Sequence, residues 1–200
     1  MKRIPAIVLA SFIFSVGALA GTVTFDNFTP LNYVWCSVSS EGLTFSSDCN
    51  GTGIMYVWDV PKGGNGTPAL ILGYGHTNFM AITDTGGQDF NLTDFQMALS
   101  FYDPLPSDTV TLTAIFENQA PLTEVLTLTP NLQTFTFDFK NVRILYLSGV
   151  SYDHPAYWVL DNIDFSEVPG SGPPTPTPEP TSIILLATGA LGLATRFRRA

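Results

Sequence analysis

The residue types that could perform catalysis are sparse in this chain. His76 and His154 are the only histidines among 200 residues, too few for a three-histidine zinc site. No Gly-x-Ser-x-Gly segment occurs, because Gly149-Val150-Ser151-Tyr152 lacks the second glycine. Asp153-His154-Pro155 is the most suggestive catalytic fragment, but a proline after a polar pair is more typical of a turn. Acids are plentiful, yet glycoside hydrolysis needs two at a defined separation. We therefore predict no catalytic residues and no enzymatic activity, with a secreted glycan-active hydrolase as the least favoured alternative.

Cys36 and Cys49 are the only cysteines. Both lie in the part of the chain that we expect to be exported, where thiols oxidise, so a Cys36–Cys49 disulfide is the simplest interpretation. A metal-binding or nucleophilic pair is the alternative, but no third cysteine and no nearby histidine supports it. Closing this short loop would stabilise the fold by about 2–3 kcal/mol.

Aromatic side chains favour a binding role. Tyrosine and tryptophan combine an apolar face with a hydrogen-bonding edge, which matches the two kinds of surface on a sugar ring. The candidate glycan platform consists of Trp35, Trp58, Tyr157 and Trp158. The alternative is that most large aromatics of a β-sandwich belong to its core, and we expect Phe135, Phe137 and at least one tryptophan to be buried.

The elements that must position these residues are short strands. Threonine alternates with apolar residues over the first five positions of Val110–Phe116, and Thr134–Phe139 repeats the alternation. Such a period of two places one strand face on a core and the other in solvent. The other expected strands are Thr22–Asp26, Leu43–Ser46, Ile54–Asp59, Ala69–Leu72, Phe79–Thr83, Asp94–Phe101, Val125–Leu128, Val142–Leu147 and Tyr157–Phe165. No helical period is sustained here, so residues 21–168 are predicted to form an all-β, jelly-roll-type β-sandwich of about ten strands.

The N-terminus has the pattern of a secretory signal. Two basic residues precede an apolar run from Ile4 to Leu19, and small residues follow it. This predicts a signal peptide with a short helix over residues 1–20, removed by signal peptidase. The cleavage site comprises Ala18, Ala20 and Gly21. A membrane-anchoring helix is the alternative, but about 16 apolar residues are short for a hydrocarbon core of about 30 Å.

The C-terminus has three parts in a fixed order. A Pro/Gly/Ser/Thr linker at 169–177 precedes Pro178-Glu179-Pro180, an uncharged run over 181–195 and a terminal arginine cluster. As a helix the run would span roughly 22 Å, which makes it a short transmembrane helix. The cluster consists of Arg196, Arg198 and Arg199, and it would act as a cytoplasmic stop.

This order resembles the PEP-CTERM sorting signal of Gram-negative bacteria, which the membrane protease-transpeptidase exosortase recognises. The resemblance implies that residues 178–200 are the sorting signal and that Pro178, Glu179 and Pro180 form its processing motif. It implies exosortase and signal peptidase as partners, a transient stay in the inner membrane through the C-terminal helix, and a final place at the cell surface or in the extracellular matrix. A plain single-span anchor with a proline-rich stalk is the alternative.

The body resembles galactose-binding-like and carbohydrate-binding jelly rolls in its opening strand Val23–Asp26, its middle strand Phe90–Phe95 and its final strand Trp158–Phe165. In such jelly rolls calcium often ties the first strand to the last, which makes Asp26 and Asp161 candidate ligands and calcium the one candidate cofactor. The alternative is that Asp161-Asn162 bonds to its own backbone. We therefore expect an exported non-enzymatic protein associated with exopolysaccharide or biofilm, with a carbohydrate-binding module, calcium-stapled or not, as the alternative.

Charge excludes one class of partner. The chain has 8 Lys+Arg against 17 Asp+Glu, and five of the basic residues lie in the two terminal segments. Residues 21–180 keep three basic residues and all 17 acids, a net charge of −14. Such a body repels the phosphate backbone, so no nucleic-acid partner is expected.

Overall fold

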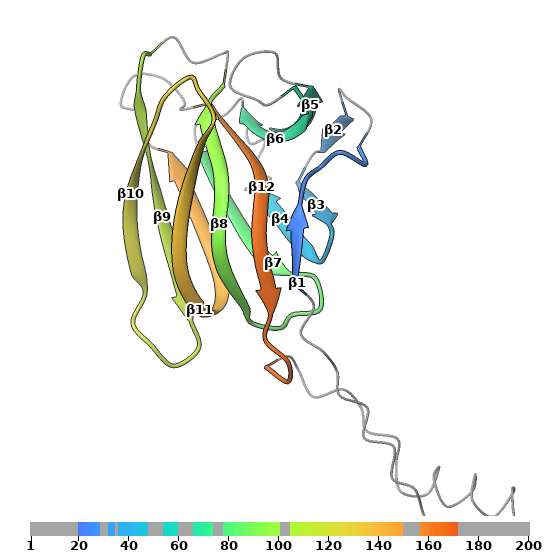
Figure 1. The fold of residues 1–200 in the computed structure, drawn as a ribbon, viewed down its shortest axis with the longest axis vertical. Coiled ribbons are helices and arrows are strands. Elements are labelled where there is room, and N and C mark those ends of the chain that lie inside the picture. Colours follow the sequence, from blue (N-terminus) through green and yellow to red (C-terminus); the bar gives the residue numbers. More distant parts are fainter. Residues whose placement is uncertain are drawn as a thin grey trace, which may run out of the picture.

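The computed structural model describes residues 20–28, 32–34, 36–47, 54–59, 66–73, 78–100, 105–149 and 157–171. This described part contains twelve strands and no helix (Figure 1). The strands are β1 (Ala20–Val23), β2 (Asn32–Val34), β3 (Ser37–Ser40), β4 (Leu43–Ser47), β5 (Ile54–Asp59), β6 (Pro68–Gly73), β7 (Asn78–Asp84), β8 (Phe90–Leu99), β9 (Asp108–Phe116), β10 (Leu122–Leu128), β11 (Gln133–Gly149) and β12 (Trp158–Glu167). All their pairings are antiparallel. The all-β prediction is confirmed.

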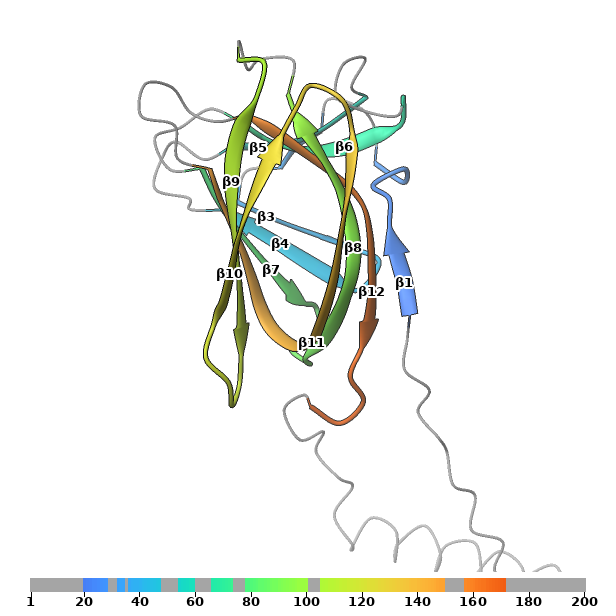
Figure 2. The same cartoon turned by 60° about the vertical axis from the view of Figure 1, so that its left-hand side comes forward.

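The strands form two layers that share one long strand, β11. Its first half, Gln133–Val142, pairs with β8, and its second half, Val142–Gly149, pairs with β9 and β7. One layer therefore has the order β2-β5-β6-β12-β8-β11, with β1 beside the end of β12. The other has the order β10-β9-β11-β7-β4-β3. Figure 2 shows β8 and β12 in one layer and β3, β4 and β7 crossing behind them in the other.

Strand β11 passes from one layer to the other at Asn141. This residue has a φ of 57°, and register shifts flank it between Phe139 and Val142 and between Val142 and Ile144. Extra residues in one strand of a ladder bend that strand and increase its twist. The prediction of two separate strands, Thr134–Phe139 and Val142–Leu147, is wrong because a left-handed asparagine lets the chain turn this corner without leaving the sheet.

The space between the layers is filled by apolar side chains. Phe25, Phe45, Phe90, Phe95 and Trp158 are among the largest fully buried ones. The structure follows the period of two in β9, since Val110, Leu112, Ala114 and Phe116 are buried and the Thr and Ile residues between them are not. Each large apolar side chain taken from water contributes about 1.5–3 kcal/mol, so this pattern fixes which face of each strand points inward.

Both ends of the body lie at the same end of the sandwich. Ala20 is paired with Ser166 near the end of the last strand. Beyond that strand, the Ser171 hydroxyl accepts the backbone N–H of Asp89 at 2.7 Å and donates to the Val168 carbonyl at 2.8 Å. Ser171 belongs to the predicted linker, so the first linker residues are tied to the body.

The predicted signal helix and C-terminal helix lie outside the described residues. Within the described ranges, no helix is long and apolar enough to cross a membrane.

The β3–β4 hairpin depends on a glycine. Glu41 and Gly42 both have positive φ, 47° and 96°, the combination of a type I′ turn. A Cβ on Gly42 would lie 3.2 Å from the Phe165 ring, which is itself buried in the core. A larger residue at position 42 would therefore be strained by the positive φ and would have too little room beside the Phe165 ring.

We expect Gly42→Ala to destabilise the protein by about 1–3 kcal/mol, because strain at φ 96° adds to the contact with Phe165. Gly170→Ala is the matched control, since its φ is 82° but a Cβ there would meet nothing within 4 Å. Urea denaturation followed by tryptophan fluorescence measures both variants. Equal losses in the two, or no loss at Gly42, would contradict the role given to Phe165.

Candidate functional site

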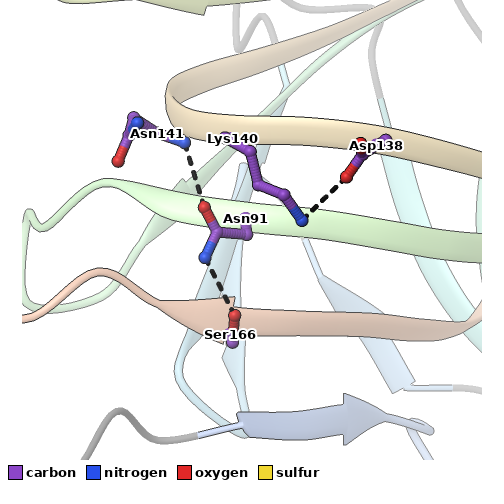
Figure 3. Close-up of polar contacts among 5 residues, drawn as sticks. All are labelled: Asn91, Asp138, Lys140, Asn141 and Ser166. Carbon is purple, nitrogen blue, oxygen red and sulfur yellow. Dashed lines mark hydrogen bonds and ion pairs between the residues drawn. The ribbon is translucent and has the colours of Figure 1, made fainter.

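The outward side of β12, β8 and the first half of β11, which we call the amide face, carries hydrogen bonds from strand to strand. Asn91 on β8 lies at its centre: its Nδ2 donates to Ser166 Oγ at 3.1 Å, and its Oδ1 accepts the backbone N–H of Asn141 at 3.1 Å (Figure 3). Lys140 and Asp138 form an ion pair at 2.8 Å beside them. The Asn91 side chain thus links β12, β8 and the corner of β11.

A second row of amides crosses the same three strands. Asn162 Nδ2 donates to Gln96 Oε1 at 2.9 Å, and Gln96 Nε2 donates to Thr134 Oγ1 at 3.4 Å. Asn162 has a φ of 46° and lies at a register shift between Asp161 and Asp164. The bulge aims its amide along the sheet, so the row couples the positions of β12, β8 and β11.

Two carboxylates face each other between these rows. Asp164 is paired with Asp94 across β12 and β8, and the Thr22 hydroxyl donates to Asp164 Oδ1. Burial raises the pKa of Asp94 above its ordinary value of 3.8, and the neighbouring Asp164 charge raises it further. On this half-buried surface the pair can accept hydrogen bonds from hydroxyl groups.

Asp89 is a buried acid at the start of β8. Burial raises its pKa, the Glu117 carboxylate adds to the rise, and Arg143 opposes it. Arg143 is itself paired with Glu117 at 3.4 Å. Because the Asp89 backbone also bonds with Ser171 and Val168, this acid lies where the chain leaves the body.

The two candidate calcium ligands differ in their surroundings. Asp26 is exposed, whereas Asp161 has no exposed surface and accepts the backbone N–H of Asn162 on Oδ1 at 2.9 Å. That bond is the one expected if Asp161-Asn162 serves its own backbone. In the described ranges, no three His, Cys, Asp or Glu side chains are grouped as metal ligands. Calcium binding at Asp26 and Asp161 stays a prediction.

The structure contradicts one of the four residues proposed as a glycan platform. Trp158 is fully buried, so its assignment to a sugar-binding surface is wrong: the alternation of β12 turns it inward with Leu160. Tyr157 is half-buried. Trp35 and the side chain of Trp58 lie outside the described residues. The burial of Phe137 and of one tryptophan is confirmed, and Phe135 is half-buried against the core.

The remaining predicted residues lie mostly beyond the described ranges. These are Ala18, Cys49, His76, Asp153, His154 and the whole C-terminal motif. The other two signal peptidase residues, Ala20 and Gly21, are the first residues of β1. Cys36 is described, and its carbonyl accepts the backbone N–H of Ser47 at 2.9 Å. The Cys36–Cys49 bridge stays a prediction.

A second surface was missed by the sequence analysis. It is the outward side of β3, β4, β7, β9, β10 and the second half of β11, which we call the hydroxyl face. Phe79 and Tyr146 are half-buried on it, with ring centroids 4.9 Å apart. The available signal was the alternation in β7, where Met80 and Ile82 point inward and force Phe79 outward. In β11 the bulge at the corner hides the corresponding signal for Tyr146.

With the body's geometry established, the C-terminal segment can be compared with known proteins. Residues 176–199 match the model of the PEP-CTERM protein-sorting motif. The chain carries a PEP-CTERM sorting motif. The match covers Pro178, Glu179 and Pro180 together with the apolar run and the arginines. The PEP-CTERM motif implies export and processing by an exosortase, typical of Gram-negative bacteria. No curated protein matches the chain.

Solved structures offer distant likenesses to the body that precedes the PEP-CTERM motif. An exo-beta-agarase is 16% identical with a TM-score of 0.44, over 74% of this chain and 25% of the agarase chain. The C-terminal family 22 carbohydrate-binding module of Clostridium thermocellum Xyn10B is 14% identical with a TM-score of 0.42, over 76% of this chain and 94% of the module. The family 11 carbohydrate-binding module of the same organism is 14% identical with a TM-score of 0.39, over 74% of this chain and 96% of the module. Likenesses at this level do not identify a ligand.

We expect Asp94→Asn to stabilise the fold at about pH 7. The raised pKa of Asp94 means that the folded protein binds the carboxyl proton more tightly than the unfolded chain does. At a pH above the ordinary pKa of 3.8, the ionised carboxylate therefore lowers the stability of the fold. This loss of stability disappears as the pH falls and the carboxyl group is protonated in both states. The thermal midpoint of the variant should exceed that of the wild type near neutrality, and the gap should narrow toward pH 4. Asp138→Asn, on the same face but 88% exposed, is the control and should gain nothing. A constant gap for Asp94→Asn at every pH would contradict the assigned cause.

Proposed function

We propose that this protein is exported, held briefly in the inner membrane, processed by an exosortase-type transpeptidase and left at the cell surface or in the extracellular matrix as a non-catalytic β-sandwich. The observation that carries the proposal is the PEP-CTERM motif at residues 176–199. The motif lies a short distance after the body, because the last contacts of the described fold are the hydrogen bonds of Ser171 with Asp89 and Val168. The pattern of the first 20 residues adds a route of export.

The arrangement of the body supports this role. The first strand begins beside the end of the last strand, so the signal segment and the sorting segment join the sandwich at one end. A body tethered at one end leaves the outward faces of both layers free. Those faces present amides, carboxylates, hydroxyls and two aromatic rings, which are the groups that hydrogen-bond and stack with sugars. We therefore include association with extracellular polysaccharide in the proposed function.

Sorting can be tested with Glu179→Gln in the bacterium that carries the protein. If the Pro178-Glu179-Pro180 segment is the processing site, the variant should accumulate in the inner membrane at the mass of the unprocessed form, while the wild type is found at the surface or in the medium. Fractionation and immunoblotting measure this distribution.

Glu124→Gln provides the matched control. Glu124 is an exposed acid on β10, so this substitution makes the same chemical change far from the motif. It should be sorted like the wild type. Normal surface delivery of the Glu179 variant would remove the role given to the segment.

The Cys36–Cys49 disulfide belongs to the same proposal, since an exported protein meets an oxidising compartment. The backbone contact between Cys36 and Ser47 at 2.9 Å brings the chain two residues before Cys49 beside Cys36. We expect the exported protein to weigh two hydrogen atoms less than its reduced form, and reduction to lower stability by about 2–3 kcal/mol. Mass spectrometry after alkylation measures the first effect. Alkylation of both cysteines without prior reduction would show that the bridge is absent.

A further inference from the structure

The hydroxyl face is organised in rows that cross the second layer. One row runs straight from edge to edge, because the pairings Ser37 with Ser46, Ser46 with Ala81, Ala81 with Tyr146, Tyr146 with Thr113 and Thr113 with Thr123 follow one another. Apart from Tyr146, every side chain in the row is short. The tyrosine ring therefore stands above a low surface of hydroxyl and methyl groups.

A second row supplies another ring beside the first. Phe79 is paired with Ser148, Ser148 with Thr111, and Thr111 with Val125. Phe79 and Tyr146 are diagonal neighbours in these rows, with ring centroids 4.9 Å apart and planes inclined at 33°. Both are half-buried, so part of each side chain is open to solvent.

The hydroxyl face differs in charge from the rest of the protein. The chain carries 17 Asp+Glu, and the amide face carries Asp94, Asp138 and Asp164. On the described outward positions of β3, β4, β7, β9, β10 and the second half of β11, no Asp, Glu, Lys or Arg occurs apart from Arg143, which is paired with Glu117 at the corner. Glu124 of β10 is exposed, but it is paired with the buried Leu112 and so lies on the other side of its strand. A face of this size without charge, in so acidic a protein, suits an uncharged partner.

We propose that the hydroxyl face binds a neutral polysaccharide, with Phe79 and Tyr146 stacking on the apolar side of its sugar rings and Thr111, Thr113 and Ser148 bonding its hydroxyls. The proposal rests on the proposed function, to which it adds the binding surface and the class of glycan. Serine and threonine hydroxyls both donate and accept, as sugar hydroxyls do. In the described part of this face an anionic polysaccharide finds only Arg143, whose charge is already paired with Glu117, and it is repelled by the net charge of the body.

The test is affinity electrophoresis of the full-length chain, kept soluble in a polyoxyethylene detergent that has no sugar headgroup. Soluble β-glucan, xylan and galactan serve as neutral probes, and alginate serves as the anionic one. At least one neutral probe should retard the wild type, and alginate should not. Tyr146→Ala and Phe79→Ala should each weaken binding by about tenfold.

Two further variants separate binding from folding. Ala81→Glu leaves both rings in place but adds a charge and bulk beside Tyr146, and it should abolish retardation with little change in the thermal midpoint. Thr136→Ala is the control, because Thr136 is exposed on the first half of β11 and belongs to the amide face. It should bind like the wild type.

Three outcomes would overturn the proposal. The first is that no neutral probe retards the wild type. The second is that retardation survives Ala81→Glu but is lost in an amide-face variant such as Asn91→Ala, which would leave polysaccharide association standing and move it to the other face. The third is self-association of the chain that Ala81→Glu abolishes, seen by sedimentation velocity, without glycan binding. None of these outcomes affects sorting, which is measured separately by fractionation of Glu179→Gln.

Discussion

The backbone hydrogen bonds of β11 are the constraint on which the rest of the structure depends. This one strand supplies the ladder for β8 with its first half and for β9 and β7 with its second. The other strands of each layer are attached through those three. The bend at Asn141 therefore sets how the two layers face each other, and with them the direction of every outward side chain. Asn91 reinforces this point, because its carbonyl oxygen accepts the Asn141 N–H while its amide reaches Ser166.

How far the sequence could predict this fold depends on the strand. In β9, threonine and apolar residues alternate up to Ala114, and the burial of the strand keeps the same period of two through to Phe116. In β8, β11 and β12, bulges shift the register, so a period of two counted along the sequence loses track of which face a residue lies on. Tyr146 was missed for this reason.

Trp158 was assigned to a surface because an aromatic residue at the start of a strand has no intrinsic preference for either face. Only the packing of the facing layer shows that Trp158 belongs to the core. The three-residue strand β2 and the short hairpin strand β3 were missed as well, since three or four residues carry too little pattern.

Basic and acidic residues are distributed differently between the terminal segments and the body of the chain. The basic residues at the two ends belong to the predicted export and sorting segments, and all the acids except Glu179 belong to the body. Within the body the separation continues, because the amide face holds carboxylates, whereas the described outward positions on the strands of the hydroxyl face hold none. A strongly acidic body stays soluble and avoids anionic surfaces, while its uncharged face remains able to approach a neutral polymer. In the proposed function, the sorting motif directs delivery, and the outward faces make the contacts with extracellular material.

Delivery by the PEP-CTERM motif is tested most directly by the intact mass of the protein recovered from the cell surface or the medium. Removal of both terminal segments predicts a chain that begins at Gly21 and ends upstream of the apolar run at residues 181–195, apart from any group attached to its new C-terminus. A recovered protein that still ends in Arg198-Arg199-Ala200 would contradict processing at this motif and would identify the C-terminal segment as a permanent anchor.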